Sequence, residues 1–266
     1  LLMELSLVVT YVSFTYKFQI LQMKIFKYKN NLIKEISGLK NLAFIPTMGA
    51  LHKGHISLID RAKKKSKQVL VSVYINPKQF NSKKEFKKYP KNFNKDINIL
   101  KRKKIDYLYV PNHKDIHSFK VKKNIYLDKF SKKLCGKFRP GHFKAVVEVV
   151  NRFLEIVKPK LIYLGMKDFQ QLYLIKLHLN KKKIKTKLIA CPTIRGSNGL
   201  ALSSRNTRLN NSQILAAGMI YNYLKKNKKL IHRKLLSKNK NEIVNKLIKL
   251  GADKVEYVEC LDIKKL

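Results

Sequence analysis

Short apolar segments alternate with helix-patterned segments along most of the chain, and this alternation limits the possible folds more than any other feature. The segments expected to form buried strands are 42–46, 69–75, 105–110, 161–164 and 187–191. The segments with the apolar period of a helix are 55–62, 92–103, 143–157 and 168–179. Strands separated by helices usually pair in parallel, and their ligands bind at the carboxyl ends of the strands. We therefore expect an α/β fold with a mostly parallel sheet.

The pattern changes near residue 210. Two helix-patterned segments, 212–227 and 241–250, flank a lysine-rich stretch and precede a strand-like run over 255–261. We expect residues 23–209 to form a Rossmann-like catalytic domain and residues 210–266 to form a smaller C-terminal α+β domain. Residues 1–22 are apolar but are interrupted by Ser, Thr, Glu and Lys, and we interpret them as an upstream extension. The alternative is a membrane-associating tail.

The chain is strongly basic, with a formal net charge of +43 from 59 Lys+Arg and 16 Asp+Glu. Such a balance is typical of nucleic-acid-binding proteins. Here, however, the lysines are spread along the whole chain, and their abundance together with Asn and Ile indicates an AT-rich coding sequence. We expect no specific nucleic-acid partner and no membrane partner. The three cysteines, Cys135, Cys191 and Cys260, have neither disulfide-framework nor zinc spacing, so a cytoplasmic location is expected.

A histidine-containing turn lies where an expected strand meets an expected helix. Residues 46–55 read Pro-Thr-Met-Gly-Ala-Leu-His-Lys-Gly-His. Backbone N–H groups at a helix N-terminus attract anions, and imidazoles can bind phosphate. The spacing His52-x-Gly54-His55 resembles the signature of nucleotidyltransferases, in which Gly54 would let the backbone approach the nucleotide. The alternative is a pair of surface histidines in a loop.

Arginine is rare in this chain, and half of its eight residues lie in or beside the segments described here. These four are Arg139, Arg195, Arg205 and Arg208. Since lysine supplies most positive charge elsewhere, arginine at these places indicates bidentate recognition of phosphate or carboxylate. Chance clustering is the alternative.

Four further segments follow the histidine turn in a fixed order. They are Val-Ser-Val-Tyr-Ile-Asn-Pro-Lys-Gln-Phe over 71–80, Arg-Pro-Gly-His-Phe over 139–143, Gly-Met-Lys-Asp-Phe-Gln-Gln-Leu over 165–172, and Gly-Leu-Ala-Leu-Ser-Ser-Arg-Asn over 199–206. With the turn, they resemble the pantoate–β-alanine ligase family from about Met23 to the end of the chain. Other adenylyltransferases that share only the histidine motif lack these additional segments.

This resemblance implies a two-step reaction. The carboxylate of pantoate attacks the α-phosphate of ATP to give pantoyl adenylate and pyrophosphate, and the amine of β-alanine then displaces AMP to give pantothenate. The resemblance also implies Mg²⁺ with the ATP and a homodimer. A superfamily alternative is an adenylyltransferase for another acid, and an alternative from a different class is a basic nucleic-acid-binding protein without catalysis.

The resemblance also assigns residues. Those corresponding to ATP contacts are Met48, Gly49, Ala50, Leu51, His52, Lys53, Gly54, His55, Gly165, Met166, Lys167, Asp168, Ile194, Leu202, Ser203, Ser204 and Arg205. Those expected to act in catalysis are His55, in the proton-donor position, His52, Lys167 and Arg205. Gln79 and Gln171 correspond to the pair that binds pantoate, and Gln79 also to a β-alanine contact. Two amides suit a hydroxy acid because they donate to a carboxylate and accept from hydroxyl groups.

Some residues near these motifs are assigned less directly. Arg139 and His142 either orient a carboxylate or phosphate or have a structural role, and Asp96 is a candidate metal or supporting contact. The family's Gly-Glu-Lys-Asp reads Gly-Met-Lys-Asp here, so Met166 matters only if the missing carboxylate orients Lys167. By the family pattern, about one strand and a short helix after Leu266 would complete the small domain, which we expect to be truncated.

Overall fold

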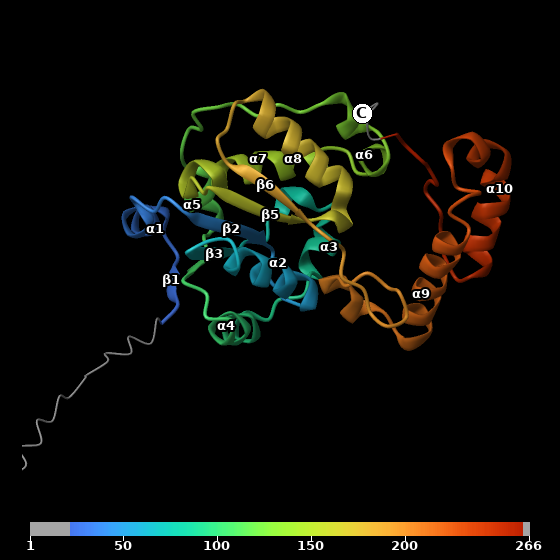
Figure 1. The fold of residues 1–266 in the computed structure, drawn as a ribbon, viewed down its shortest axis with the longest axis horizontal. Helices are drawn as coiled ribbons and strands as arrows, with labels where there is room; N and C mark the ends of the chain where they lie inside the picture. The colour runs from blue at the N-terminus through green and yellow to red at the C-terminus, as the bar shows by residue number, and fades with distance from the viewer. Residues whose placement is uncertain (1–21, 263–266) are drawn as a thin grey trace, which may run out of the picture.

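A parallel six-stranded sheet forms the centre of the molecule (Figure 1). The computed structural model describes residues 22–262, apart from the side chains of residues 233 and 234. The strands are β1 (Lys24–Phe26), β2 (Leu42–Thr47), β3 (Gln68–Val73), β4 (Tyr107–Tyr109), β5 (Leu161–Gly165) and β6 (Lys187–Cys191). Their order is β1-β4-β3-β2-β5-β6, and every pair is parallel. This arrangement confirms the α/β fold, and the order reverses between β2 and β5, where ligands of such sheets bind.

Helices cover both faces of the sheet. They are α1 (Lys29–Ile36), α2 (Lys53–Lys63), α3 (Lys83–Lys87), α4 (Phe93–Arg102), α5 (His113–His117), α6 (Cys135–Phe138), α7 (His142–Val157), α8 (Phe169–Lys181), α9 (Asn211–Lys226) and α10 (Arg233–Lys249). α7 and α8 pack on one face, and α2 and α4 pack on the other. α9 and α10 lie to one side of the sheet in Figure 1. None of the helices in the described residues is both long and apolar enough to cross a membrane.

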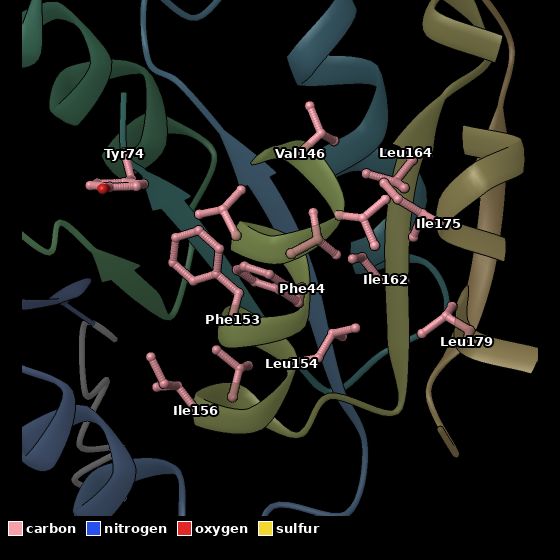
Figure 2. Packing of buried hydrophobic residues seen from close by; sticks show 14 of the residues in the cluster. Phe44, Tyr74, Val146, Phe153, Leu154, Ile156, Ile162, Leu164, Ile175 and Leu179 are labelled. Atoms are coloured by element: carbon pink, nitrogen blue, oxygen red, sulfur yellow. The ribbon is translucent and has the colours of Figure 1, made fainter. Parts of the chain in front are cut away.

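The central strand β2 is buried from both sides. Phe44 packs against the α7 layer, with its ring centroid 5.5 Å from that of Phe153 (Figure 2). Ala43 and Ile45 point to the opposite layer and pack with residues of α2. A strand buried on both faces reads as a continuous apolar run, which is why this segment was recognisable from sequence. Its carboxyl end is thereby held in a fixed position where the histidine turn begins.

The region after residue 210 differs from expectation in one respect. The predicted strand over 255–261 is wrong, because this segment has no strand pairing and the described residues from 210 onward contain only α9 and α10 as regular elements. A strand needs a hydrogen-bonded neighbour, and this region supplies none. Val258 instead packs against Leu236, Ile243 and Leu247 in a small separate cluster. The interpretation of residues 1–22 falls outside the described residues for all but the last of them.

His178 on α8 anchors the segment that follows α5. Its Nδ1 accepts a hydrogen bond from the backbone N–H of Tyr126 (3.1 Å), so its proton is on Nε2, which lies 3.0 Å from Oδ1 of Asn151. Burial, with a smaller effect of Lys182, lowers the pKa of His178 to about 4. Protonation would break the bond from Tyr126, so this arrangement needs the neutral imidazole.

We therefore expect His178 to make folding acid-sensitive. Its pKa is lowered in the folded state, so its contribution is complete above the unfolded pKa near 6.5 and is lost as the pH falls toward 4. Between pH 7 and pH 5 the free energy of unfolding should fall by about 2 kcal/mol from this group alone. Urea denaturation at both pH values would measure it, and His178→Gln should reduce the difference by that amount. An unchanged difference in the variant would contradict the assignment.

Candidate active site

The turn after β2 is held by a buried carboxylate. Gly49 and Ala50 both have positive φ angles (77° and 50°), and the carboxylate of Asp96 accepts hydrogen bonds from the N–H groups of Ala50 (2.8 Å) and Leu51 (2.7 Å). A Cβ atom on Gly49 would lie 3.0 Å from Oδ2 of Asp96 and 3.0 Å from Cγ1 of Val73, so glycine is required there. Asp96 thus supports the turn, since each of its carboxylate oxygens accepts one hydrogen bond from the backbone there.

Removing this carboxylate should loosen the turn. We expect Asp96→Ala to lower the free energy of unfolding by about 3 kcal/mol, because two buried backbone N–H groups lose a charged acceptor. The KM for ATP, the substrate that the resemblance implies, should rise about tenfold, since the turn then samples other conformations. Urea denaturation and steady-state kinetics would measure both effects. Asp60→Ala is the matched control, because it removes an exposed pair with Lys103 that is worth at most about 1 kcal/mol; equal losses in the two variants would contradict the role of Asp96.

The two histidines begin helix α2 as a reciprocal cap. Nδ1 of His52 accepts from the N–H of Gly54 (3.1 Å), and Nδ1 of His55 accepts from the N–H of His52 (3.4 Å). An acceptor Nδ1 places the proton of a neutral imidazole on Nε2. A Cβ atom on Gly54 would lie 2.7 Å from Cε1 of His52, so the glycine makes room for this ring. That Gly54 also lets the backbone approach a nucleotide stays a prediction.

Both imidazoles are neutral at physiological pH. Burial, followed by the effects of His52 and Lys167, lowers the pKa of His55 to about 3. Burial and Lys167 also lower the pKa of His52. The two rings lie close together, with centroids 4.1 Å apart. Each therefore presents an Nε2–H donor without carrying a charge of its own.

A cavity at the carboxyl ends of β2, β5 and β6 brings most of the predicted ATP residues together. We call it the histidine cavity. The predicted residues that line it are Met48, His52, Gly54, His55, Gly165, Lys167, Asp168, Ile194, Leu202, Ser203, Ser204 and Arg205. The predicted residues that do not line it are Gly49, Ala50, Leu51, Lys53 and Met166. The side chain of Met166 is 45% exposed and contributes no lining surface, so the departure from the family pattern falls outside the cavity.

A second cavity, which we call the glutamine cavity, adjoins the first. Gln79 and Gln171 both line it, over an apolar wall that includes Val146 and Phe153 of α7. The two cavities share the lining residues Pro46, Met48, His55, Tyr89, Leu164, Asp168 and Gln171. A small polar molecule in the glutamine cavity would thus meet a phosphate-bearing molecule in the histidine cavity beside His55.

Arg139 and His142 hold the backbone of Gln79. The carbonyl oxygen of Gln79 lies 2.7 Å from Nδ1 of His142 and accepts from Nη2 of Arg139 at 3.4 Å. Nε of Arg139 also donates to Oδ1 of Asn81 (3.1 Å). These contacts favour the structural alternative for both residues, in which they fix the loop and leave the side-chain amide of Gln79 to line the cavity.

Arg205 closes the histidine cavity against the segment containing α3. Its Nη2 is 2.9 Å from Oε1 of Glu85, and its guanidinium lies 5.4 Å from the ring centroid of Tyr89. Although burial opposes it, the hydrogen bonds from Arg205 and from the Asn81 N–H lower the pKa of Glu85. Neither residue was predicted, because neither belongs to a motif: Tyr89 lines the cavity only in the folded chain, and Glu85 is the ion-pair partner of Arg205 without being part of the lining.

The other arginines behave differently. Arg195 stacks over Tyr221, with its guanidinium carbon 3.6 Å from the ring centroid, and donates to the carbonyl of Gly199 (3.1 Å). Neither Arg195 nor Arg208 lines either cavity. Of the four arginines singled out in the sequence, only Arg205 therefore faces the site directly. In the described part of the chain, no group of three His, Cys, Asp or Glu side chains is placed to hold a metal ion.

Known proteins resemble this chain in sequence and in fold. The family model for pantoate-beta-alanine ligase matches residues 22–266. A pantothenate synthetase of Francisella tularensis subsp. novicida is 40% identical over 238 residues, which are 88% of this chain and 85% of that protein. A crystal structure of the pantoate-beta-alanine ligase from Francisella tularensis, complexed with Beta-gamma ATP and beta-alanine, superposes with a TM-score of 0.81 at 39% identity and covers 90% of each chain. Pantothenate synthetase from Thermus thermophilus gives a TM-score of 0.74 at 28% identity, covering 86% of this chain and 82% of that one. This chain belongs to the pantoate–β-alanine ligase family.

Proposed function

We propose that this chain carries out the family reaction, in which pantoate and β-alanine are condensed to pantothenate with ATP converted to AMP and pyrophosphate. The observation that supports this most directly is the shared wall of the two cavities. A cavity lined by histidines, Lys167 and Arg205 suits ATP, and a cavity with two amides over an apolar wall suits pantoate, whose methyl groups need apolar contact. His55 belongs to both cavities, so the carboxylate and the α-phosphate would meet there.

In the first step, a carboxylate oxygen of pantoate attacks the α-phosphorus of ATP. A new P–O bond forms, the bond between the α-phosphorus and the bridging oxygen breaks, and pyrophosphate leaves with the bonding electrons. Negative charge accumulates on the phosphate oxygens during this step. The Nε2–H groups of His52 and His55 and the ammonium group of Lys167 are the donors available to stabilise it.

In the second step, the amine of β-alanine attacks the carbonyl carbon of pantoyl adenylate. The C–N bond forms, the C–O bond to the phosphate breaks, and AMP leaves while the amine loses a proton. Gln79 is the proposed β-alanine contact, since its backbone is fixed by His142 and its side chain lines the glutamine cavity. The Francisella tularensis ligase is complexed with beta-alanine, which supports β-alanine as a substrate of this chain.

Three further properties belong to the same proposal. Mg²⁺ would be bound chiefly by the phosphates of ATP, because the described residues build no metal cage and Mg²⁺ favours phosphate oxygens and water. The protein would be a homodimer, which light scattering would test. A cytoplasmic location agrees with three cysteines that are all free thiols. We also assign residues 23–209 to the catalytic domain and residues 210–266 to the smaller one.

The reaction can be tested with one coupled assay for AMP release. AMP should accumulate with ATP, pantoate and β-alanine together, whereas labelled pyrophosphate should exchange into ATP with pantoate alone. If labelled pyrophosphate exchanged into ATP with another hydroxy acid and not with pantoate, the proposal would be wrong. The protein would then be an adenylyltransferase for that other acid. Salt-sensitive nucleic-acid binding with sequence preference and no ATP turnover would instead support the nucleic-acid alternative.

A further inference from the structure

A third cavity lies against the other side of α7. It has a volume of about 470 Å³, which falls in the range of small-molecule sites. The residues that α7 and its C-cap contribute to it lie mostly on one helical face, and they are Asn151, Leu154, Glu155, Ile156 and Lys158. The glutamine cavity takes a different set from the same helix, including Val146, Val149 and Phe153. The third cavity shares no lining residue with either catalytic cavity, so it is a separate site.

This cavity, which we call the lysine cavity, combines an apolar floor with a basic rim. Seven of its fourteen lining residues are lysines, whereas Lys167 is the only lysine among the twenty residues of the histidine cavity. In the whole chain, Lys and Arg together make up 59 of 266 residues. The enrichment therefore exceeds what the basic composition alone would produce. Between the lysines lie Ile33, Phe119, Leu154, Ile156 and Ile184.

The carboxylates beside the rim, those of Glu155 and Asp115, accept from backbone N–H groups and not from the ammonium groups of the rim lysines. Glu155 is the one acidic residue in the lining, and its carboxylate accepts from the backbone N–H groups of Lys122 (2.9 Å) and Lys123 (3.0 Å). Nζ of Lys123 donates to the carbonyl of Lys182 (2.7 Å). Among the ion pairs of the described residues, none includes a lysine of this rim.

The walls of the lysine cavity are held by buried polar contacts. The segment after α5, green in Figure 1, passes over α7, where Nδ2 of Asn151 donates to the carbonyl of Lys123 (2.8 Å). Oδ1 of Asn151 pairs with Nε2 of His178, and Nδ1 of His178 accepts from the backbone N–H of Tyr126. The cavity is therefore formed by a fixed segment rather than by a loose surface loop.

Ordinary helix capping explains only part of the lysine rim. Lys158 is the C-cap of α7 and Lys183 follows the C-cap of α8, and cations are favoured at helix C-termini. Lys29, Lys122 and Lys185 have no such reason to gather here. The floor also leaves Ile33 41% exposed, which is a cost for a surface that only solvates lysines.

We propose that the lysine cavity binds an amphipathic anion, namely an aliphatic carboxylate whose chain lies on the apolar floor and whose carboxylate meets the lysine rim. Both parts of the lining then contact the ligand, since the apolar floor removes its aliphatic chain from water and the lysine rim pairs with its carboxylate. A polyphosphate would use the rim alone, and a neutral alcohol would use the floor alone.

Calorimetric titration of the full chain with decanoate, below its micelle-forming concentration, tests the proposal. One molecule should bind per chain, while butanoate and a neutral alcohol with the chain length of decanoate should bind much more weakly. The double variant Lys122→Glu/Lys185→Glu should weaken decanoate binding about tenfold, because two exposed pairings with the carboxylate become repulsive. Ile33→Asn should weaken it as well, since the floor loses apolar area.

Lys228→Glu/Lys249→Glu is the matched control, because both lysines are exposed and the change in net charge is the same. It should bind decanoate within about twofold of the parent chain, since distant exposed charges are screened. All variants should keep pyrophosphate exchange, which shows that they are folded. The proposal fails if decanoate does not bind, if both double variants lose affinity equally, if the lysine-cavity variant loses none, or if butanoate or the alcohol binds as well as decanoate.

Discussion

Replacing His55 by alanine should reduce pyrophosphate release from ATP and pantoate by about 10²–10³-fold, the usual cost of losing one donor to a developing phosphate charge. His55 lies in the wall shared by the two cavities, and its Nδ1 is engaged by the N–H of His52. Its Nε2–H takes no part in the helix cap and is therefore free to donate to a substrate. Burial lowers the pKa of this imidazole to about 3, so the ring is neutral across the working range.

The lowered pKa of His55 predicts how the rate loss of His55→Ala depends on pH. A lowered pKa keeps the neutral form present at every pH well above 3, so the ratio of parent to variant rates should be the same at pH 6 and pH 8. Single-turnover rates at both pH values would measure it. A defect that disappears at one of these pH values would contradict a neutral donor.

Two companion variants separate chemistry from folding. His55→Gln should keep the helix start, because glutamine at this position completes a capping box, and it should still lose about tenfold or more in rate. His232→Ala, at the exposed N-cap of α10, should leave both rate and stability close to those of the parent chain. Near-normal activity in His55→Ala would overturn the assignment of the site.

The sequence predicted the centre of the sheet because the central strands are buried on both faces. β2, β3 and β5 are each apolar runs next to helices with a clear period, so their type and order followed from pattern alone. β1 has only three residues, Lys24–Phe26, and its first two are exposed, so no period could reveal it. The segment over 255–261 shows the reverse error, since a strand-like composition forms no strand without a partner.

The site was predictable where residues lie in local motifs at strand ends. His52, Gln79 and Lys167 each follow a strand closely in the chain, and parallel strands bring their carboxyl ends together. Tyr89 lines the cavity and Glu85 pairs with Arg205, and both of these residues contact Arg205 across more than a hundred residues of the chain. Asp96 likewise contacts the turn only in the folded chain, so the spacing of residues in the sequence could not reveal its hydrogen bonds to Ala50 and Leu51.

Lys167, beside Met166, is the second residue whose replacement should greatly reduce the rate of pyrophosphate release. Lys167→Ala should lower the rate of pyrophosphate release by about 10²–10³-fold, because the ammonium group is the one lysine charge in the histidine cavity. Its Nζ lies 3.2 Å from Oδ1 of Asp168, and both side chains are partly exposed, so the pair contributes little to stability. Stopped-flow measurement of pyrophosphate should therefore show a large kinetic defect, while urea denaturation shows an unchanged free energy of unfolding.

Met166→Glu is the matched test, since it restores the residue of the family pattern next to Lys167. The side chain at 166 lies outside the cavity lining, so this variant should keep its activity within about twofold of the parent. If Met166→Glu instead raised the rate about tenfold or more, a carboxylate at this position would be needed to orient Lys167, and the methionine would mark an impaired enzyme. A small effect there, combined with a large loss in Lys167→Ala, would place the function of this motif in its backbone and its lysine.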